Sequence, residues 1–118
     1  MTNDAASEVI TQLRKFRDDI DAISLRVCGK TSVSRDEKEQ LQFALKLLKL
    51  ELKEAAKRPA GNQWEVAYFG PAVRKAAANF RIATNSHPIK SSWCGALFSV
   101  RMDITYYLSQ LEDQFSKL

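Results

Sequence analysis

The stretch RIATNSHPIKSSW, residues 81–93, contains the side chains best suited to acid–base or anion-binding chemistry. His87 is the single histidine of the chain, and its ring has an ordinary pKa near neutral pH, as a general acid or base requires. Arg81 and Lys90 would add lasting positive charge beside it. Two kinds of site therefore fit this stretch, a proton-transfer site that uses His87 and an anion-binding loop.

Serines near residue 92 favour the anion-binding interpretation. Ser91 or Ser92 is placed to cap a following helix, and the free N–H groups at such a helix start bind phosphate or carboxylate. Arg74 lies seven residues before Arg81, on the same predicted helix face, and would extend the positive charge. Turn-forming residues also fill this stretch, so a plain interhelical turn is the alternative. The candidate anion-binding residues are Arg74, Arg81, His87, Lys90, Ser91 and Ser92.

Arg81 and His87, with five residues between them, resemble the Arg-(4–6 residues)-His motif of HEPN-type ribonucleases. The resemblance implies a small helical bundle, usually dimeric, in which Arg81 and His87 would be catalytic and would cleave RNA without a metal ion. Motifs of that family usually have a polar residue after the arginine, whereas Ile82 follows it here. An RNA-directed protein is thus one hypothesis, either as such a ribonuclease or through simple binding of RNA to a basic surface.

Other chemistry has little support in the sequence. There is no glycine-rich phosphate loop, no nucleophile elbow and no cluster of metal-ligating residues, so we expect no cofactor and no metal. Cys28 and Cys94 lack metal-site spacing, and the N-terminus lacks a basic segment followed by an apolar one. We therefore expect two reduced thiols in a cytoplasmic protein. No apolar run is long enough to cross a bilayer, so no membrane partner is expected.

The composition is that of one globular domain, residues 1–118, with 45% hydrophobic and 27% charged residues. The net charge of +4 is concentrated in residues 53–101, which carry eight Lys or Arg and two Asp or Glu. Such an excess favours anionic partners, nucleic acid included, although it also serves solubility alone.

Four apolar runs with a three–four spacing predict four helices and no strand. Short connections between them favour an all-α, antiparallel up-down four-helix bundle. The predicted core faces are Ala6, Val9, Leu13, Phe16, Ile20, Ile23 and Val27; Leu41, Ala44, Leu45, Leu48, Leu52 and Ala55; Val66, Phe69, Val73, Ala77 and Phe80; and Trp93, Leu97, Val100, Ile104, Leu108, Leu111, Phe115 and Leu118. Trp64, Tyr68, Tyr106 and Tyr107 are expected in the core or at its edge.

Local signals set the helix ends. Ser34 followed by Glu37 forms a capping box, and Asn62 followed by Glu65 is a second possible cap. Pro59 stops the second helix. The pair Gly70–Pro71 predicts that the third helix is kinked or split there.

The second helix carries more apolar residues than one core face needs. Phe43, Leu47 and Leu50 lie about 100° or more from the centre of its core face. They are either buried by neighbouring helices on two sides or exposed as an interface, and a line of lysines (Lys46, Lys49, Lys53 and Lys57) follows the same helix. We expect a small non-enzymatic binding or regulatory module that acts by contact with a protein partner or by self-association as a homodimer.

Overall fold

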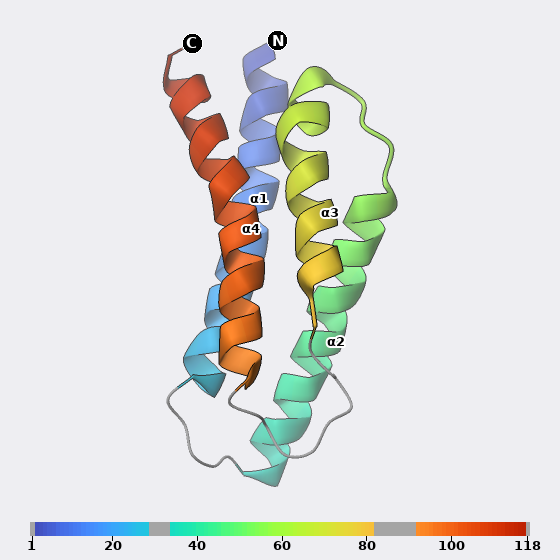
Figure 1. Ribbon diagram of the computed structural model, residues 1–118, viewed down its shortest axis with the longest axis vertical. Coiled ribbons are helices and arrows are strands. Elements are labelled where there is room, and N and C mark those ends of the chain that lie inside the picture. The colour runs from blue at the N-terminus through green and yellow to red at the C-terminus, as the bar shows by residue number, and fades with distance from the viewer. Residues whose placement is uncertain (1, 29–33, 82–91, 118) are drawn as a thin grey trace.

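All the regular structure in the described part of the chain is helical, and the helices run alternately up and down (Figure 1). The start of α1 and the end of α4 lie at the same end of the molecule. The computed structural model describes residues 2–28, 34–81 and 92–117, with α1 at Thr2–Val27, α2 at Arg35–Lys57, a π-helical turn η1 at Glu65–Phe69, α3 at Gly70–Asn79 and α4 at Ser92–Ser116. The predicted all-α four-helix bundle is confirmed.

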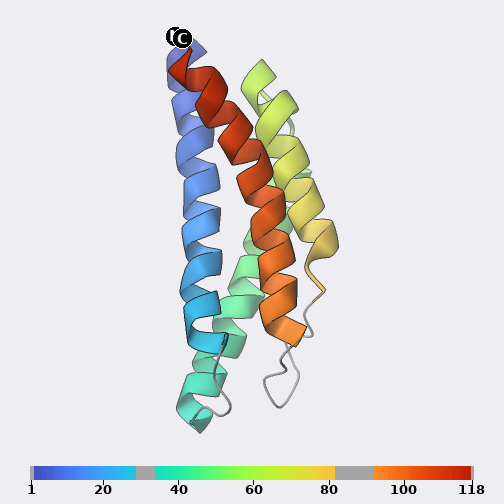
Figure 2. The ribbon, with the colours of Figure 1, turned by 60° about the vertical axis from the view of Figure 1, so that its left-hand side comes forward.

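The four helices form a ring that is closed unevenly. Helix α1 packs on α4, α4 on α3 and α3 on α2, whereas α1 and α2 make the weakest contact between neighbours. Figure 2 shows α2 leaning away from α1 toward the end where α2 finishes. Helices α2 and α4 are diagonal to one another and do not touch within the described residues. The result is a rod of 48 × 25 × 19 Å with one open side.

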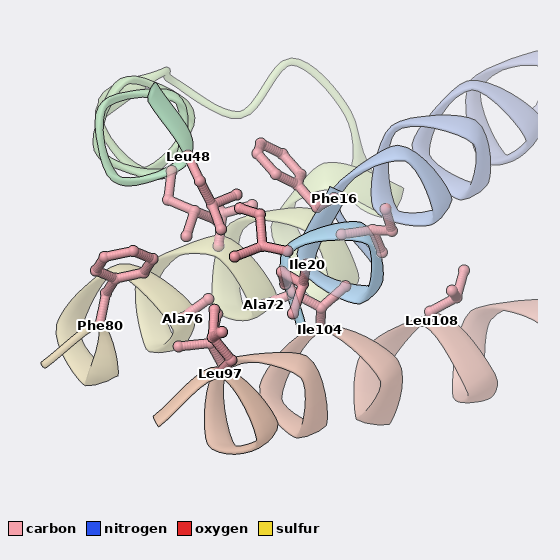
Figure 3. Packing of buried hydrophobic residues seen from close by; sticks show 14 of the residues in the cluster. Phe16, Ile20, Leu48, Ala72, Ala76, Phe80, Leu97, Ile104 and Leu108 are labelled. Atoms are coloured by element: carbon pink, nitrogen blue, oxygen red, sulfur yellow. The ribbon is translucent and has the colours of Figure 1, made fainter. Parts of the chain in front are cut away.

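The core runs along the axis of the rod, and every buried side chain among the described residues is apolar (Figure 3). All seven core residues predicted for the first helix are buried, and Ile10 joins them. The four leucines predicted for the second helix are also buried, and Ala44 and Ala55 pack against them. In α4 the predicted residues from Trp93 to Leu111 are buried, and Phe115 is partly buried; Leu118 lies outside the described residues.

Both predicted caps are present. The Ser34 hydroxyl accepts a hydrogen bond from the backbone N–H of Glu37 at 3.2 Å. Asn62 accepts from the N–H of Glu65 at 3.0 Å, and its amide nitrogen donates to the Glu65 carboxylate at 2.9 Å. Arg58 ends α2 in an extended conformation directly before Pro59, as a helix that meets a proline must end.

The interruption predicted at Gly70–Pro71 takes the form of a wide turn. The N–H of Gly70 donates to the carbonyl of Glu65, five residues back, so the chain gains one residue in this turn before α3 begins. Pro71 has no N–H to donate and its ring crowds the preceding turn, which the wider π geometry relieves. A Cβ at residue 70 would lie 3.1 Å from that Glu65 carbonyl oxygen, which explains the glycine.

The extra residue also shifts the apolar face of this segment. Val66, predicted in the core, is 60% exposed, and Ala77 is only partly buried. Ala72 and Ala76 are fully buried instead. The core prediction for Val66 is wrong because it continued an α-helical spacing through a π-helical turn.

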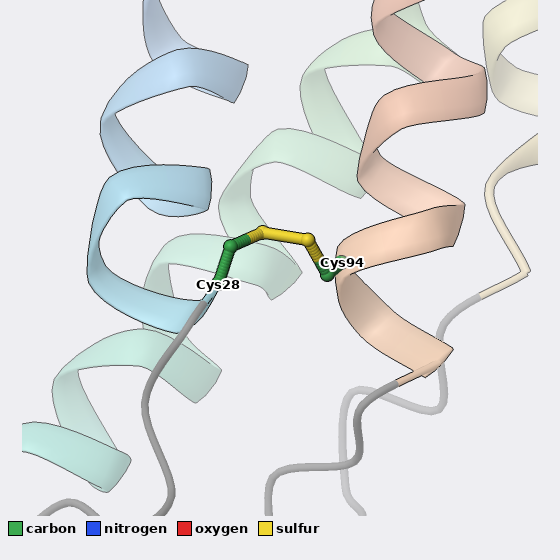
Figure 4. Close-up of a disulfide and its surroundings, with 2 residues drawn as sticks. All are labelled: Cys28 and Cys94. Carbon is green, nitrogen blue, oxygen red and sulfur yellow. A yellow bond between two sulfur atoms is a disulfide. The ribbon is translucent and has the colours of Figure 1, made fainter.

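The two cysteines form a disulfide between Cys28, directly after α1, and Cys94, in the first turn of α4 (Figure 4). Their Cα atoms are 5.3 Å apart although the residues are separated by 66 positions. In an up-down bundle the end of the first helix and the start of the fourth are neighbours, which brings the sulfurs together. The expectation of two reduced thiols is therefore wrong, and it no longer supports a cytoplasmic location.

Candidate functional site

An exposed apolar stripe on α2 consists of the three residues Phe43, Leu47 and Leu50. Between 45% and 69% of each of these residues is exposed. Burial by neighbouring helices on two sides is thus wrong for them, and the alternative that they form an interface stays a prediction. Exposed apolar surface of this kind is typical of interaction sites. We call these three residues the α2 stripe.

Leu50 borders a hollow of about 730 Å³ between α1, α2 and η1. Phe16 of α1 and Phe69 of η1 line it as well, and both are buried core residues. The guanidinium of Arg58 lies 4.8 Å from the centre of the Phe69 ring and donates to the Gln12 side chain at 3.0 Å. The remaining lining residues are Lys15, Glu51, Glu54, Ala55 and Lys57.

Leu47 borders a second hollow, of about 340 Å³, further along the same seam between α1 and α2. Ile23 and Leu48, both buried, line this hollow. Its other lining residues are Lys15, Asp19, Ala22, Arg26, Ala44 and Glu51. Leu50 and Leu47 of the α2 stripe thus border two hollows that follow one another along the seam between α1 and α2.

Lys15 and Glu51 line both hollows and join α1 to α2 across the seam. The Lys15 ammonium lies 3.2 Å from the Glu51 carboxylate and 3.0 Å from that of Asp19. The hydrogen bond to Asp19 is the largest influence on the pKa of Lys15, which is raised from its ordinary value although burial opposes the rise. We call the two hollows with this ion pair between them the α1–α2 groove.

Positive charge lies beside the stripe. Lys46, Lys53 and Lys57 are exposed on α2 and make no ion pair within the described part of the chain. On the helix the positions of Lys46 and Lys53 adjoin the α2 stripe on the side away from α1, given the ordinary turn of about 100° per residue, and Lys57 lines the larger hollow beside Leu50. The groove therefore has buried apolar side chains in its walls, charged side chains of both signs around them, and lysines along one edge.

The residues first considered for anion binding or catalysis are only partly placed. His87, Lys90 and Ser91 lie outside the described residues, and Ser92 is the first residue of α4. Arg74 and Arg81 are exposed. Helix α3 ends at Asn79, so the prediction that both arginines share one helix face is wrong, although the anion site and the RNA-directed hypothesis stay predictions.

Arg81 borders a hollow of about 480 Å³ at the α3–α4 seam. Asp103 lines the same hollow, where its carboxylate accepts a hydrogen bond from the Asn79 amide at 2.9 Å. A fixed carboxylate repels an anion, so this hollow by itself does not favour a phosphate beside Arg81.

A second exposed apolar group, on α4, was not found from the sequence. Phe98, Met102 and Tyr106 are between 51% and 61% exposed, although Tyr106 was expected at the core edge. Their four-residue spacing on one side of a helix was visible in the sequence. Counting charges around this helix would have identified them, because their side of it has none between Gly95 and Gln110.

Metal and membrane functions gain no support from the described residues. No group of three or more histidine, cysteine, aspartate or glutamate side chains among them could hold a metal ion. None of their helices combines the length and apolar character that spanning a bilayer requires. No protein-family model, curated protein or solved structure matches the chain. The function must therefore be inferred from the groove and the surfaces themselves.

Proposed function

We propose that this protein is a non-enzymatic binding module that holds an apolar helical segment of a partner protein in the α1–α2 groove. The observation that carries the proposal is the position of Leu47 and Leu50, which are exposed and yet border two aligned hollows whose walls include buried apolar side chains. A helix that docks into a groove inserts side chains spaced three, four or seven residues apart, and two hollows in line suit that spacing.

The concave shape of the α1–α2 groove suits a protein partner better than it suits a membrane surface. A bilayer is entered by convex apolar side chains, whereas the walls of this groove include residues below the surface, such as Phe16 and Phe69. Filling the larger hollow would remove the exposed side of Leu50 from water and bring new apolar contacts to those two rings.

The charges beside the groove define the chemistry of the partner. Lys46, Lys53 and Lys57 have no partner in the described residues and adjoin the α2 stripe. A bound helix with acidic residues along one edge of its apolar face would meet these lysines and gain a faster and more selective encounter. The partner segment is therefore an amphipathic helix with an acidic border.

The disulfide bears on the compartment in which such a module works. Disulfides persist in oxidising compartments and are rare in the cytoplasm, where thiols are kept reduced. The Cys28–Cys94 bond therefore favours an oxidising compartment over the cytoplasmic location expected from the sequence.

The proposal is tested with helical peptides selected from a displayed library by the disulfide-bonded chain. Selected peptides should be amphipathic with acidic borders, and Leu47→Glu should weaken their binding about tenfold or more in fluorescence anisotropy. Val66→Glu is the matched control, since Val66 is an apolar residue of similar exposure outside the groove, and it should leave affinity unchanged.

Two results would contradict the proposal. One is a selection that yields no amphipathic binder. The other is a set of binders that tolerate Leu47→Glu as well as they tolerate Val66→Glu, with both variants shown to be folded by their melting curves.

A further inference from the structure

The outward face of α4 carries no charged residue along most of its length. Between Gly95 and Gln110, within the described part of α4, the exposed residues are Gly95, Phe98, Ser99, Met102, Tyr106, Ser109 and Gln110. In a chain with 27% charged residues, a helix face of this extent without charge is unusual. We call these seven residues the neutral α4 face.

The charged residues nearest to this face lie at its sides. The Arg101 guanidinium donates to the Asp21 carboxylate of α1 at 2.6 Å. On the other side, Asp103 accepts a hydrogen bond from the Asn79 amide at the end of α3, and the exposed Arg81 lines a hollow together with Gly95 and Ser99. An approaching surface would therefore meet an uncharged centre with charged residues at its rim, the arrangement typical of protein interfaces.

The residues of this helix are arranged symmetrically about Met102. Four positions away on either side are the aromatic residues Phe98 and Tyr106, which are exposed to similar extents. Three positions away are the hydroxyl residues Ser99 and Thr105, and seven positions away are the small residues Gly95 and Ser109. Positions three, four and seven residues apart share one side of a helix. The residue types on this side therefore follow nearly the same order before Met102 as after it.

A two-fold contact with its axis at Met102 would pair similar residue types along this face, aromatic with aromatic and hydroxyl with hydroxyl. In an isologous interface residue i of one copy meets residue j of the other, and j meets i. With the axis at Met102 and the two α4 helices antiparallel, Phe98 of each copy meets Tyr106 of the other. The four-residue spacing of the exposed apolar side chains also forms the ridge by which helices commonly interlock.

Gly95 independently supports a close approach of another surface to this face of α4. A Cβ at this position would have no atom of the described residues within 4 Å, so their packing does not need a glycine here. Glycine within a helix costs about 1 kcal/mol relative to alanine. Its missing side chain is of use to a surface that approaches from outside.

We propose that the neutral α4 face is the contact between two copies of this chain, related by a two-fold axis at Met102. Two copies that each carry a net charge of +4 repel one another, and a face without charge is where they approach at the lowest electrostatic cost. The α2 stripe does not suit this contact, because its bordering lysines would face the lysines of the other copy.

The dimer leaves the α1–α2 groove free. Helices α2 and α4 are diagonal in the ring and share no contact in the described residues, so their outward faces point to opposite sides. A dimer through α4 would present two grooves on its outer sides. This inference does not rest on the proposed function, because it uses neither the groove nor its occupant.

Sedimentation of the disulfide-bonded chain from micromolar to millimolar concentration tests the contact. The wild-type chain should form a dimer, and Met102→Glu should weaken the dimer about a hundredfold or more by placing two like charges at the axis. Leu47→Glu and Val66→Glu, which add the same charge at other exposed apolar positions, should leave the dimer intact.

Cross-linking provides a second test, which detects the dimer by the formation of a covalent bond instead of by its dissociation. Met102→Cys should form a covalent dimer on mild oxidation, because the two thiols would meet at the axis, whereas Val66→Cys should not. A wild-type chain that stays monomeric at millimolar concentration would overturn the proposal. So would a dimer that survives Met102→Glu, or one that dissociates with Leu47→Glu.

Discussion

Helix α1 has a closed seam with α4 and an open one with α2. The closed seam has a disulfide at one end, the Arg101–Asp21 pair along its length, and the Arg14–Glu112 pair at 3.2 Å near the other end. Across the open seam, the polar contacts in the described residues join long side chains, such as Lys15 to Glu51 and Arg26 to Gln40 at 3.0 Å, and two hollows lie between the helices.

The difference shows that the two seams of α1 are held in different ways. A covalent bond and two ion pairs join α1 to α4, whereas two hollows lie between α1 and α2. The proposed groove thus lies at the seam that no covalent bond holds in the described residues. Substitutions that weaken one seam can be compared with substitutions that weaken the other.

Removing the disulfide should have the largest effect on stability. Replacing both Cys28 and Cys94 by serine opens a loop closed across 66 positions, which should lower the free energy of unfolding by about 4 kcal/mol. Urea unfolding of the double variant against the wild-type chain measures this loss. A loss below about 1 kcal/mol, or two free thiols in the unreduced wild-type chain, would contradict the closed seam described here.

Two adjacent leucines of α2 should respond very differently to truncation. Leu48 is 3% exposed in the core, so Leu48→Ala should cost about 3 kcal/mol. Leu47, beside it in the sequence, stands exposed at the groove, so Leu47→Ala should cost about 0.5 kcal/mol or less. Equal losses in urea unfolding would mean that the groove is closed in solution and that Leu47 is part of the core.

Replacing Lys15 should have the smallest effect on the free energy of unfolding, and that effect should depend on pH. Its pKa is raised above the ordinary 10.5, so the ion pairs stabilise the fold below that pH and are lost as the pH rises through the folded pKa. Because the side chain is 63% exposed, solvent screens the pairs, and Lys15→Met should cost only about 0.5 kcal/mol at neutral pH.

Once the pH has risen above the raised pKa of Lys15, this difference from the wild-type chain should disappear. Lys53→Met is the matched control, because Lys53 has no ion pair in the described residues, and its difference from the wild-type chain should not change in this way. If the free energies of unfolding of Lys15→Met and the wild-type chain still differ at high pH, the Lys15 side chain stabilises the fold through packing rather than through its charge.

Features governed by nearby residues were predictable from the sequence. The caps at Ser34 and Asn62 and the buried faces of α1, α2 and α4 follow from spacings within a few turns of one helix. The exposure of Val66 was not predictable from the same spacing, because a π-helical turn adds a residue in response to Gly70 and Pro71 together.

Features that join distant segments needed the fold itself. The up-down order already placed Cys28 and Cys94 at the same end of the bundle, but the thiol expectation was drawn from the N-terminus and the cysteine spacing instead. The α2 stripe was recognised as surplus apolar surface, whereas the hollows beside it depend on how far α2 leans from α1. No local pattern specifies that angle.

The most direct test of the open seam as a binding groove is to map a bound helix on the chain by nuclear magnetic resonance. A peptide selected as above is titrated into the isotope-labelled, disulfide-bonded protein, and the backbone amide shifts are followed. The shifts should be concentrated at the groove, around Lys15 and Ile23 of α1 and Leu47 and Leu50 of α2. Shifts concentrated instead on α4 around Met102, or absent from both walls of the groove, would contradict the proposed function.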